Sequence, residues 1–304
     1  MNITKYEVIE KIAETGSISR TAEYFQYTQS AVSQTVKNME KEFGINLFRR
    51  TNSGFMLTHE GAKVMECIRE INAGHRKLRE CVGSFQNLLD GDIRLGSYIS
   101  IASHILPNLI KKFNELYPHI RFDLYQEADV MLTEKLQENY LDAVFFCNPH
   151  KRDLQYQQIW KDPFVVALPE NHFLSNRDSI DLKELADESF IELQVGFGVY
   201  YQKMFSEAGF SPKIKFRMTE ELSILAMVEK GHGVAVLPWL TTFRNPYRVK
   251  TILIEPYYYR ELGLVTSKNT HLSWAVKQFI SFVAEYAKGF FDLFPEEIQE
   301  IMNS

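Results

Sequence analysis

A long apolar seam between residues 64 and 89 divides this chain and limits the folds open to it. Apolar side chains recur there at alternating steps of four and three residues, over more than three heptads. A seam of this length is typical of a helix that pairs with a second chain. Gly74 and Gly83 weaken such a helix in isolation, so packing must order it. The seam comprises Val64, Ile68, Ile71, His75, Leu78, Val82, Phe85 and Leu89, where polar His75 either sets the register or marks a point where the seam frays.

The residues before the seam predict three short helices and a β-hairpin. Gly16 and Ser17 end one helical pattern and cap the next, and the hydroxyl of Thr28 can accept hydrogen bonds at the start of a third helix. The turn residues 52–54 separate two apolar stretches, which indicates strand, turn, strand, as in a wing. We expect helices at 3–13, 18–25 and 29–42, and the hairpin at 43–51 and 55–58.

The third expected helix has a small, polar outer face. Glutamine can bond bidentately to adenine, serine adapts to several base edges, and short side chains let a helix enter the major groove closely. Periodicity alone fits an ordinary three-helix core equally well. Helical spacing allows Ala31, Val32, Val36 and Met39 to face the core. The opposite face comprises Gln29, Ser30, Ser33, Gln34 and Lys37.

After residue 91 the pattern changes to short β runs that alternate with helices. This alternation predicts parallel sheet with right-handed crossovers. One unit covers 93–146, a second starts near Phe164, and the chain crosses back near 263–266, so we expect two subdomains around a hinged cleft. The expected strands are 93–96, 120–125, 143–146, 165–169, 190–193, 213–217, 234–237 and 263–266, and the helices 100–117, 128–139, 199–208, 220–230 and 271–286.

Length, charge and cysteine content restrict the function. A chain of 304 residues is longer than a single hydrophobic core usually supports, so we expect at least two domains. The net charge of -5 for the whole chain does not favour nucleic-acid binding. Residues 1–57, however, hold seven basic and six acidic groups, and such a segment binds DNA if its cations share one face. Three cysteines without metal-ligand spacing indicate a reducing compartment. With no apolar run long enough for a membrane span, we expect a cytoplasmic protein without membrane contact.

Several motifs resemble the LysR-type transcriptional regulators. The stretches 15–17, 21–23, 29–34, 39–40, 43–44, 47–50 and 57–61 look like the family's winged helix-turn-helix. The stretches 91–96, 106–107, 113–118, 141–143, 166–169 and 231–238 look like its effector domain, which is itself similar to periplasmic binding proteins.

The resemblance implies an α+β multidomain fold. Its parts are a winged helix-turn-helix DNA-binding domain at 1–58, a linker and dimerisation helix at 59–89, and a two-subdomain α/β effector-binding domain at 90–304. Subdomain I takes 90–163 plus 267–304, and subdomain II takes 164–266.

The resemblance also implies a set of DNA contacts. Ser30 stands where the family commonly has proline, and Gln34 where it often has arginine. Affinity for DNA is therefore expected to depend on Lys37, Arg49 and Arg50 more than is typical of the family. A solvated pair at a hairpin edge is the alternative interpretation of Arg49 and Arg50. The expected DNA-binding residues are Thr28, Gln29, Ser30, Ala31, Ser33, Gln34, Lys37, Arg49, Arg50, Thr51 and Asn52.

Residues at the carboxyl ends of the expected strands predict the effector site, because ligands of open α/β sheets bind there. Each hydroxyl in this set could instead be a helix cap. No lysine or arginine falls within these segments, so an anionic inducer would meet helix N-termini and hydroxyls, and the aromatic members favour a partly aromatic ligand. The set is Ser97, Tyr98, Ser100, Ser103, Phe146, Cys147, Asn148, Gln194, Val195, Gly196, Phe197 and His232.

The function implied is sequence-specific DNA binding that a small-molecule inducer modulates. We expect no enzyme activity, catalytic residue, cofactor or metal, because phosphate loops, metalloprotease motifs and nucleophile elbows are missing from the sequence. A solute receptor for transport would explain 91–290 equally well, but the winged helix and the lack of an export signal decide against it. Expected partners are double-stranded DNA with an inverted-repeat operator, the inducer and a second copy as homodimer, with the family also implying tetramers and contact with RNA polymerase.

Overall fold

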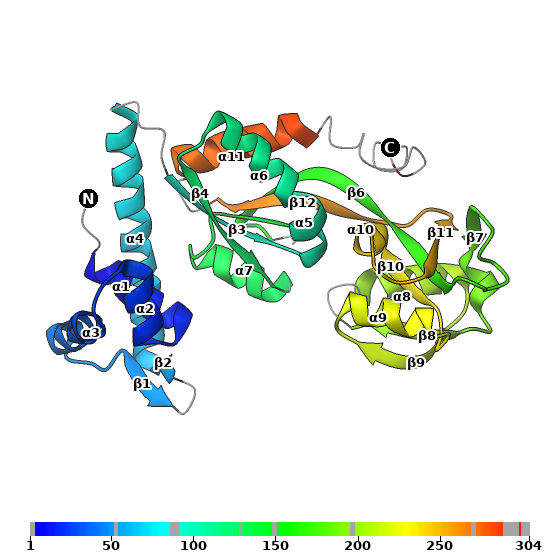
Figure 1. Ribbon diagram of the computed structural model, residues 1–304, viewed down its shortest axis with the longest axis horizontal. Helices are drawn as coiled ribbons and strands as arrows, with labels where there is room; N and C mark the ends of the chain where they lie inside the picture. The colour runs from blue at the N-terminus through cyan, green and yellow to red at the C-terminus, as the bar shows by residue number, and fades with distance from the viewer. Residues whose placement is uncertain are drawn as a thin grey trace.

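The computed structural model describes residues 4–51, 54–85, 91–127, 129–147, 151–194, 198–268 and 272–287, together with Ile298. Figure 1 shows a small N-terminal domain, a single long helix beside it, and two lobes joined by paired strands. None of the helices in these ranges combines the length and apolarity that a membrane span requires. The expected fold class, a winged helix-turn-helix with a linker helix and a two-lobed α/β domain, is confirmed.

The N-terminal domain contains α1 (Lys5–Thr15), α2 (Ile18–Phe25), α3 (Gln29–Phe43), β1 (Phe48–Thr51) and β2 (Gly54–Leu57). Each helix begins at a hydroxyl cap, because Thr4, Ser17 and Thr28 each accept a backbone N–H of the first turn. The prediction of a strand from Phe43 is wrong. Helix α3 continues through that residue and ends at Gly44, whose φ of 70° suits glycine.

Helix α4 (His59–Phe85) carries the predicted seam. The seam residues do not all lie on one exposed face of α4, since Ile68 is buried in the core of the N-terminal domain. His75 lies near α1 of the same chain, with its Nδ1 3.7 Å from Glu7 Oε1. Ile71, Leu78 and Val82 remain exposed at 44–53%. Leu89 and the side chain of Phe85 lie outside the described residues.

The first lobe is built on three parallel strands, β3 (Gly91–Ser97), β4 (Ile120–Gln126) and β5 (Ala143–Cys147). The predicted helix 100–117 is wrong as a single element, because the helix is interrupted at Ile105 and a second helix begins at Leu106, with Pro107 in its first turn. The helices of this lobe are α5 (Ile99–His104), α6 (Leu106–Leu116), α7 (Asp129–Gln137) and α11 (Trp274–Tyr286).

Two long strands connect the lobes. Strand β6 (Leu154–Pro169) and strand β12 (Tyr259–Ser267) run antiparallel side by side between them (Figure 1). The predicted parallel sheet is found in β3, β4 and β5, but the sheet as a whole is mixed, because β12 pairs antiparallel with β5 and β6. The expected start of β6 near Phe164 is wrong, since the strand begins at Leu154. The strand order is β4-β3-β5-β12-β6, continued by β11 (Val249–Glu255) and β7 (Ser179–Asp181), with β10 (Ala235–Pro238) also paired to β6.

The second lobe packs its helices around the far half of β6. The predictions omitted β7, η1, α10 and β11, which are short or lie between clearer periodic segments. Its elements are β7 (Ser179–Asp181), η1 (Leu182–Leu185), β8 (Ser189–Leu193), α8 (Gly198–Ala208), β9 (Lys213–Met218), α9 (Glu221–Glu229), β10 (Ala235–Pro238), α10 (Trp239–Thr242) and β11 (Val249–Glu255).

Candidate nucleic-acid interface and interlobe site

The outer face of α3 is exposed and short-chained. The Thr28 hydroxyl accepts the Ala31 N–H at 3.2 Å and lies 2.9 Å from the Ser30 hydroxyl, which fixes the first turn. Gln34 donates to the Asn38 side chain at 2.7 Å. Ala31, which helical spacing allowed on the core side, is exposed instead. The exposed residues of the predicted set on this helix and its cap are Thr28, Gln29, Ser30, Ala31, Gln34 and Lys37, and Ser33 is half-buried.

The hairpin beside α3 holds two exposed arginines. Arg49 and Arg50 lie on β1, opposite Met56 and Phe55 of β2. Phe55 donates its N–H to the Gly16 carbonyl at 2.8 Å, which ties the hairpin to the turn between α1 and α2. A Cβ on Gly54 would lie 2.3 Å from that carbonyl oxygen, so this close approach requires glycine. The wing is thereby held at a fixed distance from the helices.

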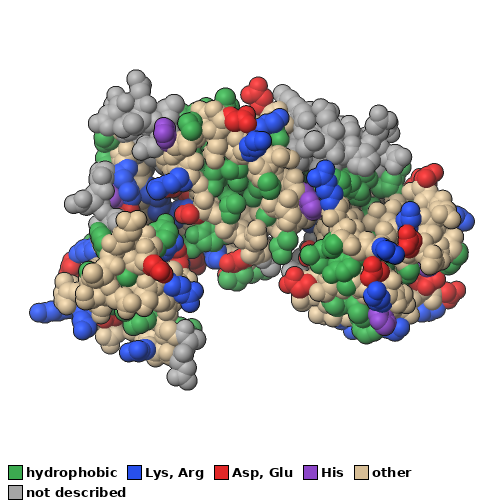
Figure 2. Space-filling model, viewed as in Figure 1, with side chains coloured by type: hydrophobic (Ala, Val, Ile, Leu, Met, Phe, Trp, Pro, Cys, Tyr) green, Lys and Arg blue, Asp and Glu red, His purple; other side chains and the backbone are tan. Residues whose placement is uncertain are grey.

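Basic side chains are visible along the lower, outer edge of the N-terminal domain (Figure 2). The Thr51 hydroxyl donates to the Gly54 carbonyl at 3.0 Å, and Asn52 lies outside the described residues. A helix with short polar side chains suits the major groove, and adjacent arginines suit the phosphates that flank it. The surface is therefore a candidate DNA interface.

A buried ion pair lies at the point where β6 and β12 cross between the lobes. Asp162 is fully buried and Arg260 is 1% exposed, with the guanidinium 2.7 Å from the carboxylate. Asp162 also accepts the Leu240 N–H at 3.0 Å, and Arg260 donates to the Ser100 hydroxyl at 3.0 Å. Burial lowers the pKa of Arg260, but attraction to Asp162 outweighs it and the pKa is raised. One pair thus connects both crossing strands, α5 and α10.

Aromatic side chains surround this pair. The Tyr98 ring lies 5.4 Å from the Arg260 guanidinium carbon and 6.3 Å from the ring of Phe146. Burial raises the pKa of Tyr200, and the neighbouring Cys147 raises it further. Together with Ser100, these side chains form what we call the Arg260 cluster: Tyr98, Ser100, Cys147, Asp162, Tyr200 and Arg260.

The Arg260 cluster brings together part of the predicted effector set. Tyr98, Ser100 and Cys147 belong to it, Phe146 contacts it through Tyr98, and Ser97 is buried at the end of β3. Arg260 lies outside the segments considered for the effector site and 160 residues from Ser100 in sequence, but its guanidinium donates to the Ser100 hydroxyl. A strand prediction extended upstream of 263 would have placed Arg260 beside Asp162.

Other predicted effector residues lie elsewhere. Ser103 and Gln194 are exposed, and the Gln194 N–H continues the pairing of β8 with β9 by donating to Met218 at 2.8 Å. His232 is exposed and packs against Phe216 of β9 with ring centroids 5.9 Å apart, so it is not part of the Arg260 cluster. Asn148, Val195, Gly196 and Phe197 lie outside the described residues.

Family models match most of the chain. Residues 3–62 match the bacterial regulatory helix-turn-helix protein of the lysR family, and residues 86–288 match the LysR substrate binding domain. The HTH-type transcriptional regulator YvbU of Bacillus subtilis is 28% identical over 288 residues, covering 94% of this chain and 98% of that protein. The dual regulator OxyR of Escherichia coli is 24% identical, covering 96% and 98%.

Solved structures with the same architecture include a full-length OxyR variant from Pseudomonas aeruginosa. It has a TM-score of 0.70 at 22% identity and covers 93% of this chain and 98% of its own. The effector binding domain of QuiR, in complex with shikimate, has a TM-score of 0.59 at 28% identity. That domain covers 66% of this chain and 98% of its own, so it corresponds to the two lobes and not to the N-terminal domain.

Proposed function

This chain belongs to the LysR family of bacterial transcriptional regulators, and from that premise we propose that it binds an inverted-repeat operator under the control of a small inducer. Its relatives are regulators rather than enzymes. The observation that carries the proposal is the exposed polar face of α3 beside two exposed arginines on the wing. We propose a cytoplasmic site of action, where the operator is.

In the proposed complex, α3 enters the major groove. Gln29, Ser30 and Ser33 read base edges, because their side chains are short and offer both donors and acceptors. Lys37, Arg49 and Arg50 contact phosphates, which supplies affinity but little sequence information. Gln34 donates one amide N–H to Asn38, which leaves its second N–H and its carbonyl oxygen to read a base.

We propose that α4 pairs with its counterpart in a second copy of the chain. Ile71, Leu78 and Val82 recur at steps of seven and four residues, so they share one face of the helix, and each is exposed. Burying that face against a copy of itself places two recognition helices on one dimer. They then meet successive major grooves when spaced by about 34 Å or a multiple of it. We further propose that the dimers assemble into tetramers and that they contact RNA polymerase. Both proposals rest only on membership of the family.

We propose that the inducer binds at the Arg260 cluster between the lobes. The shikimate complex of the QuiR domain supports a small-molecule site in a domain of this fold. Ile99 and Val199 are the sequence neighbours of Ser100 and Tyr200 and are 50% and 80% exposed, which suits lobes that close on a ligand. Because Asp162 already neutralises Arg260, the pair offers hydrogen bonds more than free charge. Lobe closure would then shift the angle between paired DNA-binding domains.

Two substitutions separate base reading from phosphate contact. Gln29→Ala weakens binding to the preferred operator by about 1–3 kcal/mol and relaxes one base position. Arg50→Ala weakens binding to all sequences alike and reduces the salt slope by about one. Binding isotherms on matched operator and scrambled duplexes, at several salt concentrations, measure both effects.

The control for this comparison is Lys203→Ala, a cation on α8 in the second lobe. This variant leaves the affinity and its salt dependence unchanged. Equal, sequence-independent losses from Gln29→Ala and Arg50→Ala would remove Gln29 from the reading surface.

A further inference from the structure

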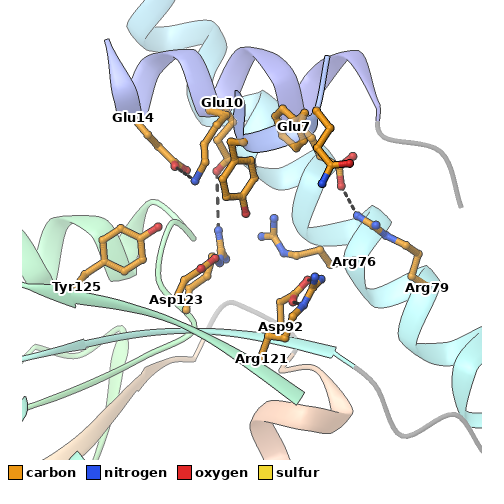
Figure 3. Close-up of a pocket in the computed structure, with 14 residues that line it drawn as sticks. Glu7, Glu10, Glu14, Arg76, Arg79, Asp92, Arg121, Asp123 and Tyr125 are labelled. Carbon is orange, nitrogen blue, oxygen red and sulfur yellow. Dashed lines mark hydrogen bonds and ion pairs between the residues drawn. The ribbon is translucent and has the colours of Figure 1, made fainter. Parts of the chain in front are cut away.

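A polar pocket of about 440 Å³ lies between the DNA-binding domain and the first lobe. Helices α1 and α2 form one wall, α4 another, and strands β3 and β4 the floor (Figure 3). It is separate from the Arg260 cluster, with which it shares no residue. A ligand bound there would contact the DNA-binding domain and the first lobe at the same time.

Most cations around the pocket already have a carboxylate partner. Arg94 on β3 bonds to Asp142 at 2.9 Å and lies 3.8 Å from Glu10 of α1, which joins the two domains. The other pairs are Lys11 with Glu14 at 2.7 Å, Arg121 with Asp92 at 2.8 Å, and Arg79 with Glu7.

Arg76 differs from these residues. Its side chain extends from α4 into the pocket, toward the space between α1 and the two strands (Figure 3). Its Nη2 atom is buried and, within the described part of the chain, has no hydrogen-bond partner. Burial lowers the pKa of Arg76 and the nearby Arg94 guanidinium lowers it further, while the carboxylates of Asp142, Glu10 and Glu7 offset only part of this. A buried guanidinium nitrogen with an unmade hydrogen bond is costly, and an anion that paired with it would remove that cost.

We propose that this pocket binds a small oxyanion, a carboxylate or phosphate group, on the guanidinium of Arg76. Both groups present two oxygens that match the planar donor edge of arginine. The aromatic rings of Tyr24 and Tyr125 line the same pocket and can pack against the body of a larger ligand. Lys11 also lies at the wall, although its charge is shared with Glu14.

Occupancy of the pocket stabilises the arrangement in which the two domains are docked, because only that arrangement forms the pocket. Arg94 lies on β3 three residues before Ser97, where the strand reaches the interlobe site. A bound oxyanion can therefore influence the strand that leads to the inducer. The pocket is a second ligand site, with a lining separate from that of the proposed inducer site.

Titration of the full-length protein with inorganic phosphate, and separately with succinate, tests the proposal. Chloride at matched ionic strength is the reference, since screening alone changes weak charge interactions. We expect saturable binding by calorimetry and a rise in the thermal midpoint with at least one of the two anions, and the anion that binds more tightly identifies the class. Arg76→Gln weakens this binding by about tenfold or more. Arg76→Lys, which keeps the charge, retains part of it.

The matched control is Arg217→Gln, which removes an exposed cation of β9 that is already paired with Glu192 and lies outside the pocket. We expect it to retain the response to the anion. Absence of saturable binding by both anions, or equal binding by wild type and a folded Arg76→Gln variant, overturns the proposal. Neither DNA nor inducer is present, so this result stands apart from the proposed regulatory function.

Discussion

Replacing Asp162 with asparagine lowers the free energy of unfolding of the two-lobed domain by about 3–5 kcal/mol. The substitution keeps the shape of the side chain but leaves the Arg260 guanidinium, 1% exposed, without its counter-charge. Asparagine keeps an oxygen that can accept the Leu240 N–H, but it carries no charge to offset the buried guanidinium. Urea denaturation of the full-length chain measures the change. Tryptophan fluorescence reports on this domain selectively, because the three tryptophans are Trp160, Trp239 and Trp274.

The matched control is Asp187→Asn. Asp187 also forms an ion pair, with Lys213 at 2.7 Å, but its side chain is fully exposed. We expect no measurable change in the urea midpoint, since exposed pairs contribute little. An Asp162→Asn midpoint equal to that of wild type would show that the pair at the crossing strands does not hold the lobes together.

Replacing both Leu78 and Val82 with aspartate makes the protein monomeric and weakens its binding to an operator with two half-sites by roughly 10²–10⁴-fold. The exposed apolar face of α4 becomes charged, so its burial against a second copy becomes unfavourable. The second recognition helix then loses its high effective concentration at the second half-site. Sedimentation measures the loss of the dimer, and binding to two-site and one-site duplexes measures the loss of affinity.

Binding to a single half-site is the internal control, and the double variant should match wild type there. Leu116→Asp is the control for surface charge, because Leu116 is 60% exposed on α6 and outside this face. A double variant that remains dimeric, or one that loses affinity equally for both duplexes, contradicts the assignment of this face to dimer contact.

Local signals account for what could be predicted in the DNA-binding domain. Thr28 caps α3 and Gly44 ends it with a positive φ, and both effects depend on neighbours within a few residues. The end of α3 was placed one residue early and a strand was expected from Phe43. The Glu40 carboxylate that accepts the Leu47 and Phe48 N–H groups instead holds the chain between α3 and β1.

The interlobe site depends on pairings that are distant in sequence. Asp162 and Arg260 face each other because β6 and β12 pair antiparallel, which the parallel pattern of the surrounding strands did not indicate. Ser100 was predicted from its position after β3, but its bond to Arg260 joins residues on separate elements. A residue's type shows what it can bind, whereas strand register decides what it meets.

The most direct test of the proposed regulator function is selection of genomic fragments by the purified protein, at two salt concentrations, followed by sequencing of the retained DNA. The proposal predicts enrichment of an interrupted inverted repeat, with half-sites one or more helical turns apart, that survives the higher salt concentration. Retention of fragments without a shared sequence, lost uniformly as salt rises, would contradict sequence-specific binding by α3 and the wing.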